Sequence, residues 1–169
     1  DPSTEAGTVP IYTDNYYWTL YENYEKDTRS RIFGNVQLDY KITEWLSILG
    51  RATLDSYTQF MDERIAVGSQ GTPGYTRYDL SFSERNYDLL ANFDKNIGAD
   101  FNVKALVGTN RRRSTYTYLG QATSGGLIVP GLYSIANSKG TVPNPTEYYQ
   151  PKAVDGYFGG LTLGYKETL

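Results

Sequence analysis

The sequence predicts an all-β fold of antiparallel up-and-down strands, forming a segment of a large transmembrane β-barrel. Aromatic residues make up 15% of the 169 residues, including 17 tyrosines, and aromatic side chains favour strands. Several stretches alternate apolar and polar residues with a period of two, which is typical of strands. The connections between these stretches are short and long in turn, as they are in outer-membrane barrels.

The clearest alternation predicts a strand over residues 30–42. From residue 31 onward, its even positions carry apolar residues or glycine, and its odd positions are polar with the exception of Phe33. Such a strand has a different medium on each of its two sides. Thr43 and Glu44 interrupt the pattern before a second strand over residues 45–58. The two strands and their short connection predict a hairpin.

Three further strands are predicted over residues 78–94, 99–112 and 156–167, with the same period of two. A short turn joins the first two of these strands. The two long connections, residues 59–76 and 111–154, contain glycine and proline residues that interrupt regular structure. No long helix is expected.

A single phase of alternation in each strand separates two sets of side chains. The set expected to face outward, towards lipid, is apolar: Ile32, Val36, Leu38, Leu46, Ile48, Leu54, Val103 and Val107. The set expected to face the lumen is polar: Asn35, Gln37, Arg51 and Lys104. The aromatic residues near the short turns are those expected at a membrane interface: Tyr40, Trp45, Phe93, Phe101 and Tyr165.

Composition excludes several chemistries. The chain has no histidine and no cysteine, so it lacks residues for structural zinc sites, thiol nucleophiles, Ser-His-Asp triads and disulfides. Its net charge of −3, with both signs scattered, gives no basic footprint for nucleic acid. Carboxylates such as Asp62 and Glu63 are adjacent in sequence, which does not by itself place them across a glycosidic bond. We therefore predict no enzyme activity, no cofactor and no metal site.

Five residues are candidate contacts for a ligand or partner. The cluster Tyr16, Tyr17 and Trp18 carries aromatic faces that stack on sugar rings, or alternatively packs a loop against the barrel rim. Arg51 and Asp55 fall on polar strand positions, where they contact a plug or a passing solute, or alternatively form a cross-strand charge ladder.

The run Arg111, Arg112 and Arg113 also has two readings. It binds an anionic ligand or a lipid headgroup, or it is a solvated strand end, as short charge runs usually are.

Four stretches of the sequence resemble the barrel of SusC-like TonB-dependent transporters. They are Trp18–Asn23, residues 31–47 with the following Gly50 and Arg51, the loop-like run Gly126–Ser138, and Gly164–Leu169. The resemblance implies a barrel of about 22 strands plugged by an N-terminal domain. It also implies import of glycans or peptides with energy relayed by TonB, together with a SusD-like surface lipoprotein.

On this basis residues 1–169 are expected to be a partial barrel segment in the bacterial outer membrane, with about five strands, two long extracellular loops and no plug domain. Lipid, the SusD-like lipoprotein and an oligosaccharide or peptide are the expected partners, with TonB engaged through other parts of the protein. The alternative is a soluble β-sandwich that binds carbohydrate or acts as an adhesin. The two differ in what covers the apolar strand face, which is lipid in the first and a dry protein core in the second.

Overall fold

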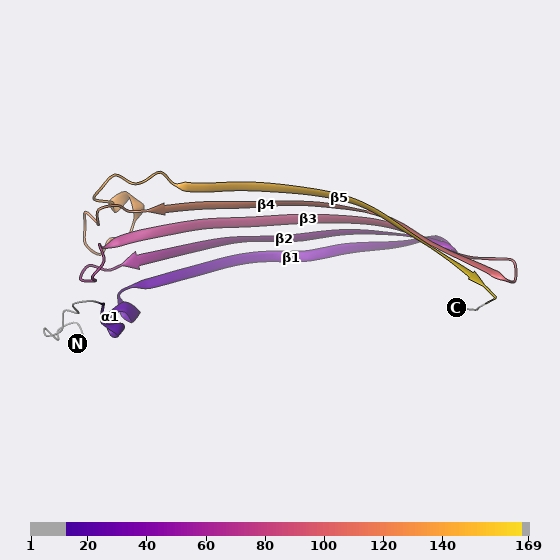
Figure 1. The fold of residues 1–169 in the computed structure, drawn as a ribbon, viewed down its shortest axis with the longest axis horizontal. Helices are drawn as coiled ribbons and strands as arrows, with labels where there is room; N and C mark the ends of the chain where they lie inside the picture. The colour runs from indigo at the N-terminus through magenta and orange to yellow at the C-terminus, as the bar shows by residue number, and fades with distance from the viewer. Residues whose placement is uncertain (1–12, 167–169) are drawn as a thin grey trace. The chain divides into compact units, whose positions relative to one another are not determined.

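The computed structural model describes residues 13–166 and consists of a single five-stranded sheet (Figure 1). The strands lie in the sheet in their order along the chain, β1-β2-β3-β4-β5, so each pairs with its sequence neighbours. Their bounds are Tyr24–Thr43 for β1, Leu46–Ile65 for β2, Gly74–Ile97 for β3, Phe101–Ala122 for β4 and Thr146–Tyr165 for β5. The predicted fold class is therefore confirmed: the chain is all-β, with antiparallel up-and-down strands.

Two short helical segments accompany the sheet. The helix α1, Tyr16–Tyr21, precedes β1, and the 3-10 helix η2, Ile135–Asn137, lies between β4 and β5. The side chain of Asn15 caps α1 by accepting a hydrogen bond of 2.9 Å from the Tyr17 amide. In the described part of the chain, neither helix has the length or apolar character to cross a membrane.

The strand ends at the short turns agree with the sequence prediction, but the ends at the long connections do not. The turns β1–β2 and β3–β4 begin and end within three residues of the predicted positions. In contrast, β4 runs to Ala122 rather than to residue 112, and β5 begins at Thr146 rather than at residue 156. The predicted long connections, residues 59–76 and 111–154, are therefore too long.

The error has a physical cause. Past the predicted ends, both sides of each strand become polar or mixed, as with Asp27 and Thr28 in β1. Period-two alternation marks a strand only where its two sides meet different media. The extra strand residues mix polar and apolar side chains on both sides, as with Phe60 and Met61 beside Asp62 and Glu63 in β2, so alternation gives no signal for them.

The chain divides into two compact units, which we describe separately. Unit 1 comprises the described residues up to Ser30, with Thr58–Ser81 and Thr117–Tyr149. Unit 2 comprises Arg31–Tyr57, Phe82–Tyr116 and the described residues from Gln150. The final three residues of the stretch Gly164–Leu169 lie outside the described part.

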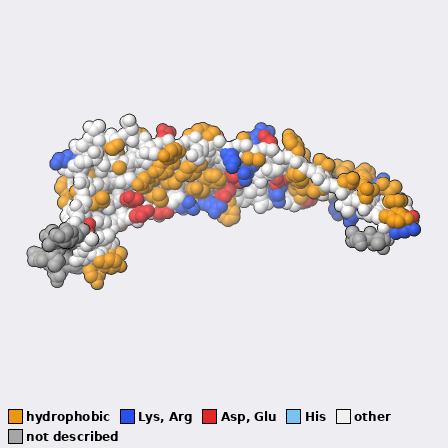
Figure 2. Space-filling view, viewed as in Figure 1, with side chains coloured by type: hydrophobic (Ala, Val, Ile, Leu, Met, Phe, Trp, Pro, Cys, Tyr) orange, Lys and Arg blue, Asp and Glu red, His pale blue; other side chains and the backbone are white. Residues whose placement is uncertain are grey.

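Few hydrophobic residues in the described part of the chain are fully buried. Ala66 is the one buried hydrophobic residue among them, and side chains such as Val36 and Leu38 are 75% and 72% exposed. Figure 2 shows hydrophobic side chains lying open on the surface in view, beside charged ones. A β-sandwich needs a second sheet packed face to face on the first. The described residues provide a single sheet, which does not support the sandwich alternative.

Side chains fix the two long connections of unit 1. Asn23 accepts hydrogen bonds from the Ala66 amide at 2.7 Å and from the Ser69 hydroxyl at 3.0 Å. Asn137, which is 5% exposed, accepts from the Val129 amide and donates to the carbonyl oxygens of Val129 and Leu132. Both connections therefore have a defined conformation.

Candidate functional site

One side of the unit 2 strands is apolar, and we call it the apolar face. Cross-strand ring contacts place its members on one side: Trp45 and Phe93 lie 5.1 Å apart, and Phe101 and Tyr165 lie 5.0 Å apart, centroid to centroid. Alternation then assigns the remaining members. The apolar face comprises Ile32, Val36, Leu38, Tyr40, Ile42, Trp45, Leu46, Ile48, Ala52, Leu54, Tyr87, Leu89, Ala91, Phe93, Phe101, Val103, Ala105, Val107, Tyr157, Leu161, Leu163 and Tyr165.

Aromatic side chains lie at both limits of the apolar face. Trp45, Phe93, Phe101 and Tyr165 lie near the short turns, as the sequence predicted. Tyr87 and Tyr157 lie at the opposite limit, where the sequence analysis did not predict an aromatic belt, and they are 49% and 85% exposed. The strand register brings them into line, and the register is not visible in the sequence of a single strand.

The other side of the unit 2 strands, which we call the polar face, carries ion pairs between neighbouring strands. Arg31 donates two hydrogen bonds to Asp55, at 2.8 and 2.6 Å. Arg51 donates to Asp88 at 2.8 and 2.6 Å. Asn110 donates to the second carboxylate oxygen of Asp88, whose side chain is only 8% exposed. Paired charges on this face, opposite an apolar face, make the sheet two-sided.

The structure therefore places the candidate residues Arg51 and Asp55 on the same face, but it does not pair them with each other. Each has its own partner on a neighbouring strand, as in the cross-strand ladder that the sequence analysis gave as the alternative. The Arg31 side chain is 50% exposed and that of Asp55 31%, so this pair remains open to solute.

The candidate aromatic cluster is split by the structure. The Trp18 ring packs against Gly68, and its indole nitrogen donates a hydrogen bond of 2.9 Å to Ser69. This residue holds α1 against the β2–β3 connection. Tyr16 and Tyr17 are 74% and 62% exposed, with ring centroids 5.8 Å apart. Two of the three rings are thus available for a ligand.

Unit 1 adds an aromatic row that the sequence analysis missed. The rings of Tyr78, Tyr118 and Tyr148 come from three adjacent strands, with centroid separations of 6.1 and 5.6 Å. Burial, followed by the charge of Glu63, raises the pKa of the Tyr78 phenol, so it stays protonated at neutral pH. Because these residues are far apart in sequence, only the strand register could have identified the row.

A groove of about 660 Å³ lies in unit 1. Its lining combines rings, hydroxyl groups and charges, including Tyr118, Tyr149, Ser81, Arg77 and Asp79. Rings with hydrogen-bonding groups suit polar solutes such as sugars or peptides. Among the described residues, no group of three acidic side chains could hold a metal ion.

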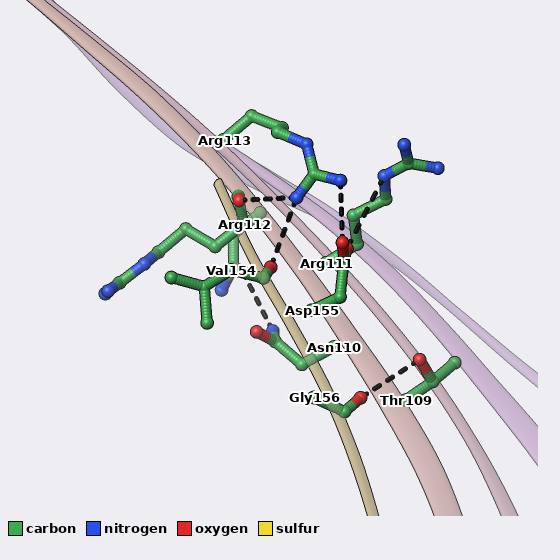
Figure 3. Close-up of polar contacts among 9 residues, drawn as sticks. Thr109, Asn110, Arg111, Arg112, Arg113, Val154, Asp155 and Gly156 are labelled. Atoms are coloured by element: carbon green, nitrogen blue, oxygen red, sulfur yellow. Dashed lines mark hydrogen bonds and ion pairs between the residues drawn. The ribbon is translucent and has the colours of Figure 1, made fainter. Parts of the chain in front are cut away.

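The arginine run lies at the limit of the apolar face that Tyr87 and Tyr157 mark. Arg111 and Arg113 both point to Asp155, while Arg112 extends in a different direction (Figure 3). The Arg113–Asp155 distance is 2.8 Å and the Arg111–Asp155 distance is 3.7 Å. Arg113 also donates to the carbonyl oxygens of Arg112 and Val154, so its guanidinium is held in place.

No protein-family model and no curated protein matches the chain. Solved structures with a similar fold include the following three. The RagAB peptide importer aligns with 86% of this chain in its closed-closed state, with a TM-score of 0.73 and 13% sequence identity. In its open-open state it aligns with 90%, with a TM-score of 0.75 and 13% identity. A further structure, of the RagAB peptide transporter, aligns with 90%, with a TM-score of 0.72 and 14% identity. In each case this chain spans 17% of the matched chain, and at this identity the likeness concerns the fold.

Proposed function

We propose that this chain forms part of the barrel wall of a SusC-like TonB-dependent transporter in the bacterial outer membrane. The transporter works with a SusD-like lipoprotein as its partner and imports glycans or peptides. The chain has no enzymatic role. The observation that carries the proposal is the two-sided sheet of unit 2, with an apolar face opposite paired charges. The fold similarity to the RagAB peptide importer supports it.

The dimensions of the apolar face fit a bilayer. From Ile32 to Ile42, strand β1 rises about 34 Å along its axis, since antiparallel strands rise about 3.4 Å per residue. With the usual barrel tilt of about 40°, the height is about 26 Å, close to the apolar band of about 25 Å on outer-membrane barrels. We propose that the parts of β1 to β5 in unit 2 cross the membrane.

The proposed transport path runs along the polar face. The ion pairs of Arg31 with Asp55 and of Arg51 with Asp88 present charged groups that a solute or a plug domain can contact. The open rings of Tyr16 and Tyr17 in unit 1 provide surfaces that stack on sugars or on peptide side chains.

A matched pair of spin labels tests the proposal in the full-length protein in lipid vesicles. Residues 1–169 contain no cysteine, so Val36→Cys and Gln37→Cys each introduce a single label site into this stretch. The two sites are adjacent in sequence and lie on opposite faces. We expect oxygen, which partitions into lipid, to relax the label at residue 36 more strongly. A water-soluble nickel complex should relax the label at residue 37 more strongly. Equal accessibility of the two labels to both reagents would contradict a lipid-facing apolar face.

A further inference from the structure

We propose that Arg85, Arg111 and Arg113 form a binding site for the phosphate group of an anionic membrane lipid. The site lies at the limit of the apolar face marked by Tyr87 and Tyr157. The inference rests on the proposed function, because it takes the apolar face to contact lipid. The inference assigns a specific ligand, an anionic lipid, to the edge of the apolar face.

The alternation of β4 places the side chains of Arg111 and Arg113 on the same side as the apolar face. Arg111 and Arg113 share the phase of Val107, and both reach Asp155 on the neighbouring strand (Figure 3). Arg112 has the opposite phase and its partner is Glu84, at 4.0 Å. One residue of the run therefore belongs to the polar face, and two belong to the edge of the apolar face.

Arg85 joins this pair through the strand register. Asn110 on β4 donates to Asn86 on β3, and Arg112 lies against Glu84, so Arg85 is opposite Arg111 and Arg113. The Arg85 side chain is exposed. Three guanidinium groups and one carboxylate, that of Asp155, leave a local charge of 3 − 1 = +2.

The guanidinium groups keep donors free for a ligand. Arg111 is 67% exposed and forms a long ion pair of 3.7 Å with Asp155. A guanidinium carries five N–H donors in a planar fork that matches phosphate oxygens two at a time. Arg113 is held by two carbonyl oxygens and by Asp155, so its position is fixed before a ligand arrives.

The surface beside Arg111 suits the rest of a lipid. A hollow of about 390 Å³ is lined by Arg111 and Asp155 together with Tyr87, Leu89 and Tyr157. Amphipathic rings of tyrosine lie at the level of lipid headgroups in membrane proteins. A phosphate on the arginines would thus place the attached acyl chains along Leu89 and the apolar face, which a free phosphate ion does not use.

The test measures lipid binding to the full-length protein in detergent by native mass spectrometry, with phosphatidic acid and phosphatidylcholine as the two probes. We expect the wild-type protein to retain phosphatidic acid in preference. Each basic group near an anionic surface strengthens binding by a factor of about five, so R111Q/R113Q should bind phosphatidic acid about 25-fold more weakly. The matched control is R112Q, which removes one charge from the other face and is compared with R111Q, and it should leave the affinity within a factor of about two.

Several results would overturn the site. A loss in R112Q as large as that in R111Q, about fivefold, would mean that net charge alone drives binding. No loss in R111Q/R113Q would mean that these residues bind no lipid. Displacement of phosphatidic acid by excess inorganic phosphate would identify an ion site in place of a lipid site. R111Q alone is the second variant if the double variant does not fold, because Arg111 makes the weaker contact with Asp155. It should lose about fivefold in affinity.

The two experiments distinguish failure of the lipid site from failure of the proposed function. If the spin label at residue 36 is exposed to lipid and phosphatidic acid shows no preference, the transporter proposal stands and only the phosphate site is wrong. If the label at residue 36 is exposed to water, both proposals are wrong.

Discussion

Units 1 and 2 contain different parts of the same strands. They differ in the side chains at alternate positions on one side of those strands. In unit 2 these positions are apolar, with Ile32 and Val36 in β1. In unit 1 they are polar, with Thr28 and Ser30 in β1 and the pair Arg77 and Asp79 in β3. The difference indicates that strand formation and the medium beside a strand are separate properties. Backbone pairing extends through both units, whereas apolar–polar alternation with a period of two is regular only in unit 2.

The largest expected effect comes from removing whatever covers the apolar face. Residues 1–169 expressed alone should not form a stable soluble monomer, because Ala66 is the one buried hydrophobic residue in the described part. Folding requires apolar burial to offset the loss of conformational entropy. The exposed sheet edges formed by β1 and β5 would also pair with other copies. We expect aggregation in buffer and solubility only in detergent, as measured by size-exclusion chromatography.

Thermal unfolding of the same sample shows which outcome would contradict this expectation. A detergent-free monomer that unfolds in one sharp thermal transition would contradict the comparison, because it would mean that the sheet buries its apolar face within itself. A fragment that is soluble only in detergent would agree with unit 2 as a membrane-facing surface.

A matched pair of arginine substitutions sharpens the comparison. Val36→Arg in unit 2 should lower the free energy of unfolding in vesicles by about 2–4 kcal/mol if the residue lies near the bilayer midplane. Thr28→Arg, on the same strand and in the same phase but in unit 1, should change it by less than about 0.5 kcal/mol, as surface substitutions usually do. Urea titration of the full-length protein in lipid vesicles measures both values. Equal effects at residues 28 and 36 would remove the distinction between the two units.

The sequence predicted the strand ends of unit 2 better than those of unit 1. The strand ends near Thr43, Leu46, Ile97 and Phe101 were predictable because apolar alternation continues right up to the turns. The ends near Ala122 and at the β2–β3 connection were not, because polar and apolar side chains are mixed on both sides of the strands there. Propensity alone is a weak guide in such segments, since strand formation depends on the neighbouring strand.

The candidate contacts were predictable in kind but not in arrangement. The phase of alternation placed Arg51 and Asp55 on one face, but their partners Asp88 and Arg31 come from neighbouring strands. The role of Trp18 depended on the β2–β3 connection folding back against α1. Register and loop conformation are long-range properties, and a single sequence does not specify them.

The smallest expected effect concerns ion pairs, one in each unit. Asp88→Ala in unit 2 leaves Arg51 and Asn110 without their shared acceptor, which is only 8% exposed. We expect a loss of about 1–3 kcal/mol, since unsatisfied polar groups are costly away from water. Asp79→Ala in unit 1 removes an exposed pair with Arg77 within one strand and should cost less than about 1 kcal/mol.

Asp88→Asn separates the loss of charge from the loss of an acceptor. The amide oxygen still accepts from Arg51 or Asn110, so this variant should fall between the wild-type protein and Asp88→Ala in unfolding free energy, as measured by urea titration in vesicles. High salt should weaken the contribution of Asp79 more than that of Asp88, because exposed charges are screened more effectively than enclosed ones. If Asp88→Ala and Asp79→Ala cost the same and respond equally to salt, the polar face of unit 2 is as open to water as unit 1. The pairing of Arg51 with Asp88 would then be an ordinary surface contact with no part in holding β2, β3 and β4 in register.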